Sequence, residues 1–158
     1  MEVNKKLIKF TKEMILFCKA NGFTPIICGS YLTKYYTQDE RIVVHDVDMY
    51  VPDEFLHKAI KLLEKKKMKY KYLKEWGCLK VYKGDVNVDL DALNFLYKGP
   101  KDFRDIDFYG IKVKALSPKG LLFIYKVGVK ACQTSWERRQ HTRKVRILEK
   151  YIGKNGKI

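Results

Sequence analysis

Two aspartates one residue apart inside an apolar segment constrain this chain more than any other feature of its sequence. Asp46 and Asp48 lie within VVHDVDMYV, residues 43–51. Side chains alternate between the two faces of a β-strand, so an extended segment here places both carboxylates on one face. Neighbouring carboxylates repel each other unless a cation lies between them. Mg²⁺ meets this need, because it prefers carboxylate oxygens and leaves positions open for phosphate. The pattern therefore predicts a metal site on this strand.

A Gly-Ser pair precedes the aspartates and closes another apolar run. Ile26-Ile27-Cys28 predicts a short buried strand over 24–28, and the segment from Ser30 onward predicts a short helix. A glycine at a strand-to-helix turn lets the backbone approach a ligand, and the first amides of the helix form a natural phosphate site. Gly29 and Ser30 are therefore candidate phosphate ligands, although a Gly-Ser dipeptide alone is a weak signal.

A second acidic strand is predicted over residues 86–93, VNVDLDAL. The apolar residues of this segment alternate toward a core, and Asn87, Asp89 and Asp91 face the other way. An ordinary half-exposed strand with one polar side is the alternative interpretation. If the two acidic strands are neighbours, they bring a third carboxylate to the proposed metal site.

Composition favours one soluble domain that binds polyanions. The 158 residues can bury one core, 46% are hydrophobic and 32% are charged. We find no signal-peptide pattern and no membrane-length apolar stretch, so we expect no membrane partner. Four scattered cysteines without a CxxC pair predict reduced, mostly buried thiols in a cytoplasmic protein. The net charge is +15, and residues 119–157 hold eleven Lys or Arg against two Glu, which favours nucleotides or nucleic acid over a merely solvated surface.

Periodicity and turn signals give the remaining elements. We expect helices over 4–21, 30–38, 53–66 and 135–152 and another beginning at Ser117-Pro118, with Asn4, Asp53, Ser117 and Ser135 as N-caps. We expect strands over 24–28, 43–51, 68–74, 78–82, 86–93 and 108–116, the last of which could also be a hairpin that pivots at Gly110. Residues 97–105 are expected to form a loop, and Lys83-Gly84-Asp85 marks a second hairpin.

These motifs, in this order, resemble the nucleotidyltransferase superfamily with a DNA polymerase β-like catalytic core. The resemblance rests on Gly29-Ser30 after a strand, the hDhD strand of Asp46 and Asp48, and the hDh pattern around Asp89. The chain is similar to small members such as minimal nucleotidyltransferases, AbiEii-type toxins and lincosamide adenylyltransferases. The resemblance implies an α+β fold, with a mixed central sheet of about five strands and a basic C-terminal helical pair. It implies a single domain with its core over about 24–116 and C-terminal helices over about 117–152.

The resemblance also implies a reaction and a set of ligands. Members move an NMP from an NTP to a hydroxyl acceptor and release pyrophosphate. By analogy, Asp46 and Asp48 bridge two Mg²⁺ or Mn²⁺ ions and Asp89 binds the ion on the nucleophile side, with Asp91 as the fallback third acid. Gly29 and Ser30 would hold the β- and γ-phosphates. A cation from the C-terminal helices would neutralise the triphosphate, and Lys126 is the first choice, although it could equally be a surface lysine.

Several functional alternatives remain open at this stage. The acceptor could be RNA or tRNA, a protein or a small molecule, and the oligomeric state is not indicated. The chain could instead be a non-catalytic nucleotidyltransferase-fold binding protein, such as a toxin–antitoxin component. A metal-dependent nuclease would use the same acids, but nothing in this chain corresponds to the general-base lysine that such an enzyme usually has next to them. The gap between Ser30 and Asp46 exceeds that of the most minimal members, which predicts an extra loop near Gln38–Val43. His45 should point away from the acids and pack as a structural residue.

Overall fold

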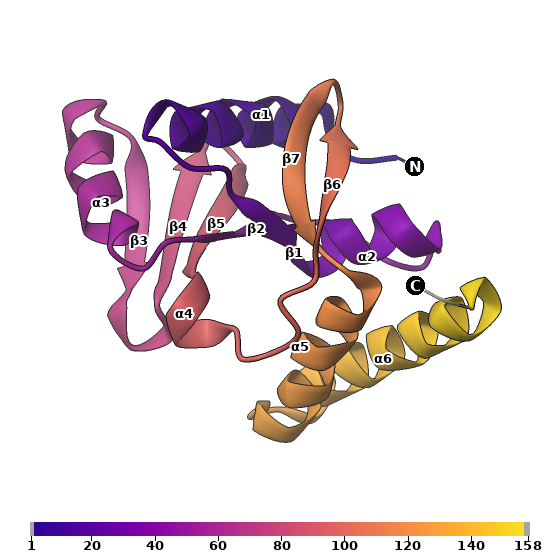
Figure 1. Ribbon diagram of the computed structural model, residues 1–158. Helices are drawn as coiled ribbons and strands as arrows, with labels where there is room; N and C mark the ends of the chain where they lie inside the picture. The colour runs from indigo at the N-terminus through magenta and orange to yellow at the C-terminus, as the bar shows by residue number, and fades with distance from the viewer. Residues whose placement is uncertain (1, 157–158) are drawn as a thin grey trace.

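The computed structural model describes residues 2–156 and shows a central sheet with helices on both sides and at one end (Figure 1). The strands are β1 (Ile26–Cys28), β2 (Val47–Val51), β3 (Lys69–Leu73), β4 (Cys78–Lys83), β5 (Val86–Ala92), β6 (Phe103–Phe108) and β7 (Ile111–Leu116). The helices are α1 (Lys5–Ala20), α2 (Gly29–Thr37), α3 (Phe55–Lys65), α4 (Leu93–Leu96), α5 (Pro118–Ala131) and α6 (Ser135–Asn155), with a 3₁₀ turn η1 (Lys74–Trp76).

The sheet is mixed, in the order β3-β4-β5-β2-β1-β7-β6. β2 runs parallel to β5, β1 runs parallel to β7, and the other neighbours are antiparallel. The expected α+β architecture with a mixed sheet is confirmed. The sheet has seven strands rather than about five, however, because the β6–β7 hairpin extends it beyond β1.

The β6–β7 hairpin explains the difference in strand number. Tyr109 and Gly110 both have positive φ, 46° and 91°, as a tight primed turn between two strands requires. The Asp107 carboxylate accepts a 3.0 Å hydrogen bond from the Gly110 amide and closes the turn. The hairpin interpretation of residues 108–116 is therefore correct, but β6 begins at Phe103, so the expected loop over 97–105 is shorter than predicted.

Two of the four predicted N-cap residues cap their helices in the structure, and two do not. Asn4 and Ser117 cap α1 and α5 as expected, accepting hydrogen bonds from the amides of Lys6 and Gly120. Thr134 rather than Ser135 caps α6, through the amide of Glu137. Asp53 does not cap α3: its carboxylate instead accepts the Asn94 amide at 2.8 Å. This contact ties the segment before α3 to α4, which the sequence analysis did not predict.

The packing of the helices leaves the acidic ends of β2 and β5 facing the C-terminal helices. α1 packs on β5, α3 packs on β3, and α2 packs on β2. α5 and α6 form a helical hairpin, and both contact α2 (Figure 1). This hairpin confirms the expected basic helical pair. No helix within residues 2–156 is long and apolar enough to cross a bilayer.

Candidate active site

One row of residues across four strands forms the floor of the site. Cys28 on β1 is opposite Asp48 on β2, Asp48 is opposite Asp89 on β5, and Asp89 is opposite Lys80 on β4. Residues that are opposite each other in neighbouring strands project from the same face of the sheet. The parallel pairing of β2 and β5 therefore brings the two acidic strands side by side, as the sequence suggested they could be.

Three carboxylates meet on this face. Asp46, Asp48 and Asp89 each offer an oxygen, and these oxygens lie within 4.8 Å of one another. β2 begins at Val47 rather than near residue 43, so Asp46 immediately precedes the strand. Asp91 is outside this group, because it lies two residues further along β5 and is opposite Tyr50. The geometry therefore favours Asp89 over Asp91 as the third acid.

Burial and the charges of neighbouring carboxylates raise the pKa values of Asp48, Asp89 and Asp91. Burial is the largest cause that raises the pKa of Asp48, followed by the charges of Asp46, Asp91 and Asp89. Burial also raises the pKa of Asp89, against the opposing hydrogen bond from Lys80. Burial raises the pKa of Asp91 to about 7. The ionised forms of these carboxyl groups are therefore disfavoured in the protein alone, and a bound cation would stabilise them.

Asn87 adds a neutral partner to the cluster. Its side-chain amide donates to Asp89 Oδ1 at 2.8 Å and to Asp46 Oδ2 at 3.5 Å. The amide therefore fixes the relative orientation of two carboxylates that come from different strands. The sequence analysis placed Asn87 on the acidic face but gave it no role.

The turn at Gly29 brings the start of α2 against Asp48. Gly29 has a φ of +74°, and a Cβ atom there would overlap Asp48 Oδ2. Only glycine accepts both the left-handed backbone and this close approach. Gly29 is also the first residue of α2, and the first amides of a helix lack intrahelical partners. The structure thus places a potential anion site next to the carboxylate cluster.

Lys144 of α6 supplies the cation nearest this turn. Its ammonium donates a 2.7 Å hydrogen bond to Ser30 Oγ and lies 5.0 Å from the centre of the Tyr125 ring. Burial lowers the pKa of Lys144, whereas the charges of Asp48 and Asp46 raise it. Lys126, the lysine favoured by the sequence, lies instead beside Glu149 at 3.4 Å with a half-exposed side chain.

The sequence did contain a signal that Lys144 belongs to the site, namely its position in the helical repeat. Lys144 is four residues before Leu148, an apolar residue of the helix predicted over 135–152. Residues four apart lie on one face of a helix, so Lys144 belongs to the face that packs on the rest of the protein. A lysine on a packing face is a stronger candidate for a site than one on a solvated face.

Lys80 is a second cation beside the acids, and it was not predicted from the sequence. Its ammonium lies 2.6 Å from Asp89 Oδ2, and although burial lowers its pKa, the hydrogen bond with Asp89 raises it overall. The β4–β5 hairpin pairs Lys83 with Val86 and therefore pairs Lys80 with Asp89. The hairpin signal at Gly84 would have given this register. The expectation that no lysine accompanies the acids is thus wrong.

A cavity of about 890 Å³ opens above the acids. Ser30, Asp46, Lys80 and Lys144 contribute to its walls, together with the exposed ring of Trp136 at the start of α6. A volume of this size falls in the range of small-ligand sites. The cavity is therefore large enough for a nucleotide beside the carboxylate cluster.

The segment between α2 and β2 forms one wall of this cavity. Arg41, Ile42, Val43 and His45 all line it. Within α2, the buried ammonium of Lys34 donates to the Ile42 carbonyl at 3.0 Å and so holds the segment in place. The predicted extra loop is thus part of the site. His45 is exposed and lines the cavity, contrary to the expected packed position.

Comparison with known proteins identifies the fold. No family model matches the sequence, and no curated protein matches it. Among solved structures, the antibiotic-resistance factor ANT(2'')-Ia superposes with a TM-score of 0.67 at 11% identity, over 96% of this chain and 92% of that one. The lincosamide adenylyltransferase LnuA gives a TM-score of 0.59 at 12% identity, over 96% of this chain and 99% of that one. The Megavirus polyadenylate synthase gives 0.55 at 13% identity, over 93% of this chain but 31% of that one.

These similarities show that the chain has the nucleotidyltransferase fold, as the motif resemblance implied. Sequence identities of 11–13% support a shared fold but not a shared activity or substrate. One fold can serve many functions, so the chemistry of this chain depends on its own residues.

Proposed function

We propose that this protein is a metal-dependent nucleotidyltransferase that moves an NMP from an NTP to a hydroxyl acceptor. The observation that carries this proposal is the cluster of Asp46, Asp48 and Asp89 beside the Gly29-Ser30 turn, at the base of a nucleotide-sized cavity. The acceptor oxygen bonds to the α-phosphorus and loses its proton to solvent. The bond from that phosphorus to the bridging oxygen breaks, and pyrophosphate leaves with the electron pair.

The three carboxylates would hold one or two divalent ions, Mg²⁺ or Mn²⁺. Their donor set fits, because it consists of hard oxygen ligands whose excess negative charge is partly buried. A bound divalent ion neutralises phosphate charge and lowers the pKa of the acceptor hydroxyl. Asn87 keeps Asp46 and Asp89 oriented, and Gly29 leaves room for Asp48.

The remaining roles belong to the turn and to α6. The amides at Gly29 and the hydroxyl of Ser30 hold the β- and γ-phosphates, and Lys144 neutralises them from its position on Ser30. We assign this role to Lys144 rather than Lys126, because Lys126 is paired with Glu149. Positioning and charge neutralisation supply much of the catalysis in phosphoryl-group transfer.

Transfer of label tests the proposal directly. The protein is incubated with Mg²⁺ and each NTP labelled at the α-phosphate, with RNA, proteins and small hydroxyl compounds offered as acceptors. We expect one class of acceptor to become labelled and pyrophosphate to be released. The matched control is an Asp46→Asn/Asp48→Asn variant, which should transfer nothing. NTP binding without any transfer would instead support the non-catalytic binding protein.

A metal-dependent nuclease is the second candidate, and one observation favours it. Lys80 lies beside Asp89 at 2.6 Å, so the acids do have a neighbouring lysine, although Asp89 holds it in its charged form. A nuclease would degrade RNA with Mg²⁺ alone, and Lys80→Ala would abolish this degradation. The transferase remains the first candidate, because the Gly29-Ser30 turn and Lys144 form a phosphate site that a nuclease does not need.

A further inference from the structure

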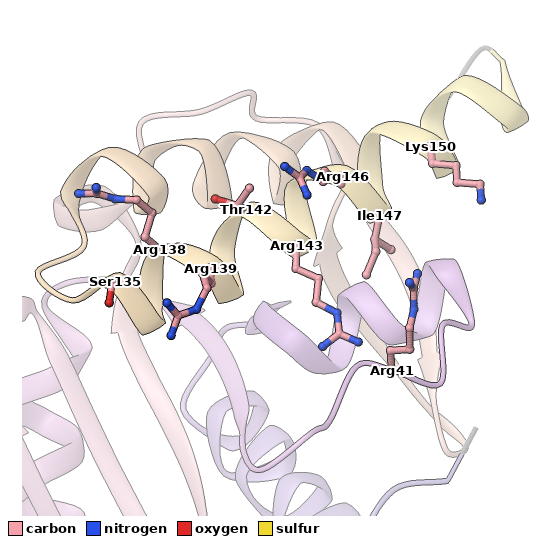
Figure 2. A pocket seen from close by; sticks show the side chains of 9 residues that line it. All are labelled: Arg41, Ser135, Arg138, Arg139, Thr142, Arg143, Arg146, Ile147 and Lys150. Carbon is pink, nitrogen blue, oxygen red and sulfur yellow. The ribbon is translucent and has the colours of Figure 1, made fainter.

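A second cavity, of about 770 Å³, runs along α6 and is lined mostly by cations. We call it the arginine groove. Figure 2 shows its side chains along the length of α6 and on the loop that carries Arg41. Its cationic lining consists of Arg41, Arg138, Arg139, Arg143, Arg146 and Lys150. No acidic residue lines it within the part of the chain that the structure describes.

Most of the charge of the groove has no acidic partner in the described part of the chain: of its cations only Arg41 is paired, with Asp39. Within residues 2–156, none of the five α6 cations of the groove forms an ion pair, and the two acids of α6 are engaged elsewhere. Glu149 pairs with Lys126, and Glu137 accepts the Gln133 amide. Arg41 is oriented by Asp39, with an Nε–Oδ1 distance of 2.9 Å, yet its side chain remains 64% exposed.

The arrangement differs from a solvated charged face. Arg143 reaches from α6 toward the loop of Arg41, so these two like charges face each other across the groove (Figure 2). Converging guanidinium groups repel each other until an anion lies between them. The groove also uses arginine five times and lysine once, and arginine is the side chain that matches phosphate geometry in a two-point contact.

The spacing of the cations suits a repeating anion. Arg139, Arg143, Arg146 and Lys150 follow one another at intervals of three or four residues, which places one cation on each helical turn of about 5.4 Å. A single phosphate would satisfy only one or two of them. A polyphosphate backbone laid along α6 would contact the whole series.

The arginine groove adjoins the cavity above the carboxylates. Arg41, Arg143 and Ile147 line both cavities. An anionic chain in the groove can therefore extend its end toward Asp46. The ring of Trp136, which is 62% exposed, lies in the wall of the cavity above the carboxylates and offers a surface on which a base can stack.

We propose that the arginine groove binds a single-stranded nucleic acid and delivers its terminal hydroxyl to the carboxylate cluster. The cation series recognises the phosphate backbone, and Trp136 recognises a base. A single strand is required, because its end must enter the cavity over the acids. An acceptor that carries several ammonium groups would be repelled. The delivery of a hydroxyl rests on the proposed transferase activity, but the binding of the strand does not.

Binding is measured by fluorescence anisotropy with labelled single strands of about 12 nucleotides, as RNA and as DNA, over a range of salt. The protein is the Asp46→Asn/Asp48→Asn variant without NTP, so that no transfer occurs. Four phosphate contacts predict that log K falls with log salt with a slope of about −3. The RNA and DNA arms identify which strand is preferred.

Charge reversal tests the location of binding. The variant Arg139→Glu/Arg146→Glu/Lys150→Glu should bind at least about tenfold more weakly and with a flatter salt slope. Its matched control, Lys58→Glu/Lys61→Glu/Lys65→Glu, changes the net charge equally on exposed positions of α3, far from α6 (Figure 1). The control should retain most of the affinity. Trp136→Ala should weaken binding without flattening the salt slope.

Several outcomes would overturn the inference. Equal losses in the two charge-reversal variants would show that binding depends only on net charge. Tighter binding to duplexes, to an acidic peptide or to phosphatidylserine–phosphatidylcholine vesicles than to single strands would assign the groove to another partner. Label transfer to a small hydroxyl compound with no strand binding would refute this inference alone. Strand binding with no NMP transfer to any acceptor would refute the transferase alone.

Discussion

The ammonium of Lys144 donates a 2.7 Å hydrogen bond to the hydroxyl of Ser30, which is 114 residues earlier in the chain. This contact joins α6 to the first turn of α2, where the backbone approaches Asp48 most closely. The C-terminal helices are therefore part of the site rather than an appendage. The same helix carries the arginine groove on its exposed side.

The Lys144→Gln variant tests the phosphate-binding role. Glutamine keeps a hydrogen-bond donor but loses the charge, so we expect kcat/KM for the NTP to fall by about tenfold to a hundredfold, the worth of one charge-assisted hydrogen bond. Lys126→Gln is the matched control in the neighbouring helix and should change kcat/KM by less than about twofold. Equal effects in the two variants, measured by pyrophosphate release, would remove the special role of Lys144.

The Gly29→Ala variant tests the close approach of α2 to Asp48. Any Cβ at a positive φ costs about 1–2 kcal/mol of stability, and here it also displaces the Asp48 carboxylate. Gly110→Ala isolates the backbone cost, because Gly110 has a φ of +91° with nothing within 4 Å of an added Cβ. We expect thermal unfolding to show a larger loss for Gly29→Ala, and only this variant to lose NMP transfer. Similar Tm values for the two variants, with NMP transfer retained in Gly29→Ala, would mean that Asp48 does not need the space that Gly29 leaves.

Metal binding should stabilise the folded protein. An ion that binds only the folded state at about 100 times its Kd adds about 2.7 kcal/mol, which for a chain of this size raises Tm by roughly 5–10 °C. Differential scanning fluorimetry with millimolar Mg²⁺ or Mn²⁺ measures this rise. The Asp46→Ala/Asp48→Ala variant should show none. Asp85→Ala, at an exposed turn acid, should keep the full rise, and an equal rise in both variants would place the ion elsewhere.

Thiol reactivity tests the packing of the sheet and of α1. Burial raises the pKa of Cys18 to about 12 and holds those of Cys28 and Cys78 well above the ordinary thiol value, whereas Cys132 is partly exposed. Only the thiolate reacts with alkylating reagents. Iodoacetamide at pH 8 should therefore modify one thiol of the native protein, at Cys132, and all four after denaturation. Modification of Cys28 in the native state would contradict the buried position assigned to it.

Local patterns were enough to predict most of the elements and the identity of the acids. Alternation placed Asp46 and Asp48 on one face of a strand and identified a second acidic strand that carries Asp89. The side chains of a strand point to the same face at every second residue, whatever surrounds the strand. The structure confirms the mixed sheet and the helical hairpin. The strand count was too low, because β6 has few local signals and is defined by its pairing with β7.

Pairing between distant strands decided which acids meet. The hDh pattern in residues 86–93 favoured Asp89 and left Asp91 as the fallback, but alternation places both on the same face. The parallel register of β2 and β5 sets Asp89 opposite Asp48 and Asp91 opposite Tyr50. Lys80 follows from a hairpin register, which is local and could have been predicted from Gly84.

The sequence by itself determined the chemistry available to this protein: closely spaced carboxylates, a glycine turn and a basic C-terminal segment, all of which depend on residue type and short-range repeats. Only the tertiary structure decided how these parts combine. It selected Lys144 over Lys126, turned the loop after α2 into a cavity wall, and set Arg41 opposite Arg143. These choices depend on how α6 packs against α2. The helical repeat indicates which face of α6 packs on the protein, but not which distant residues that face meets.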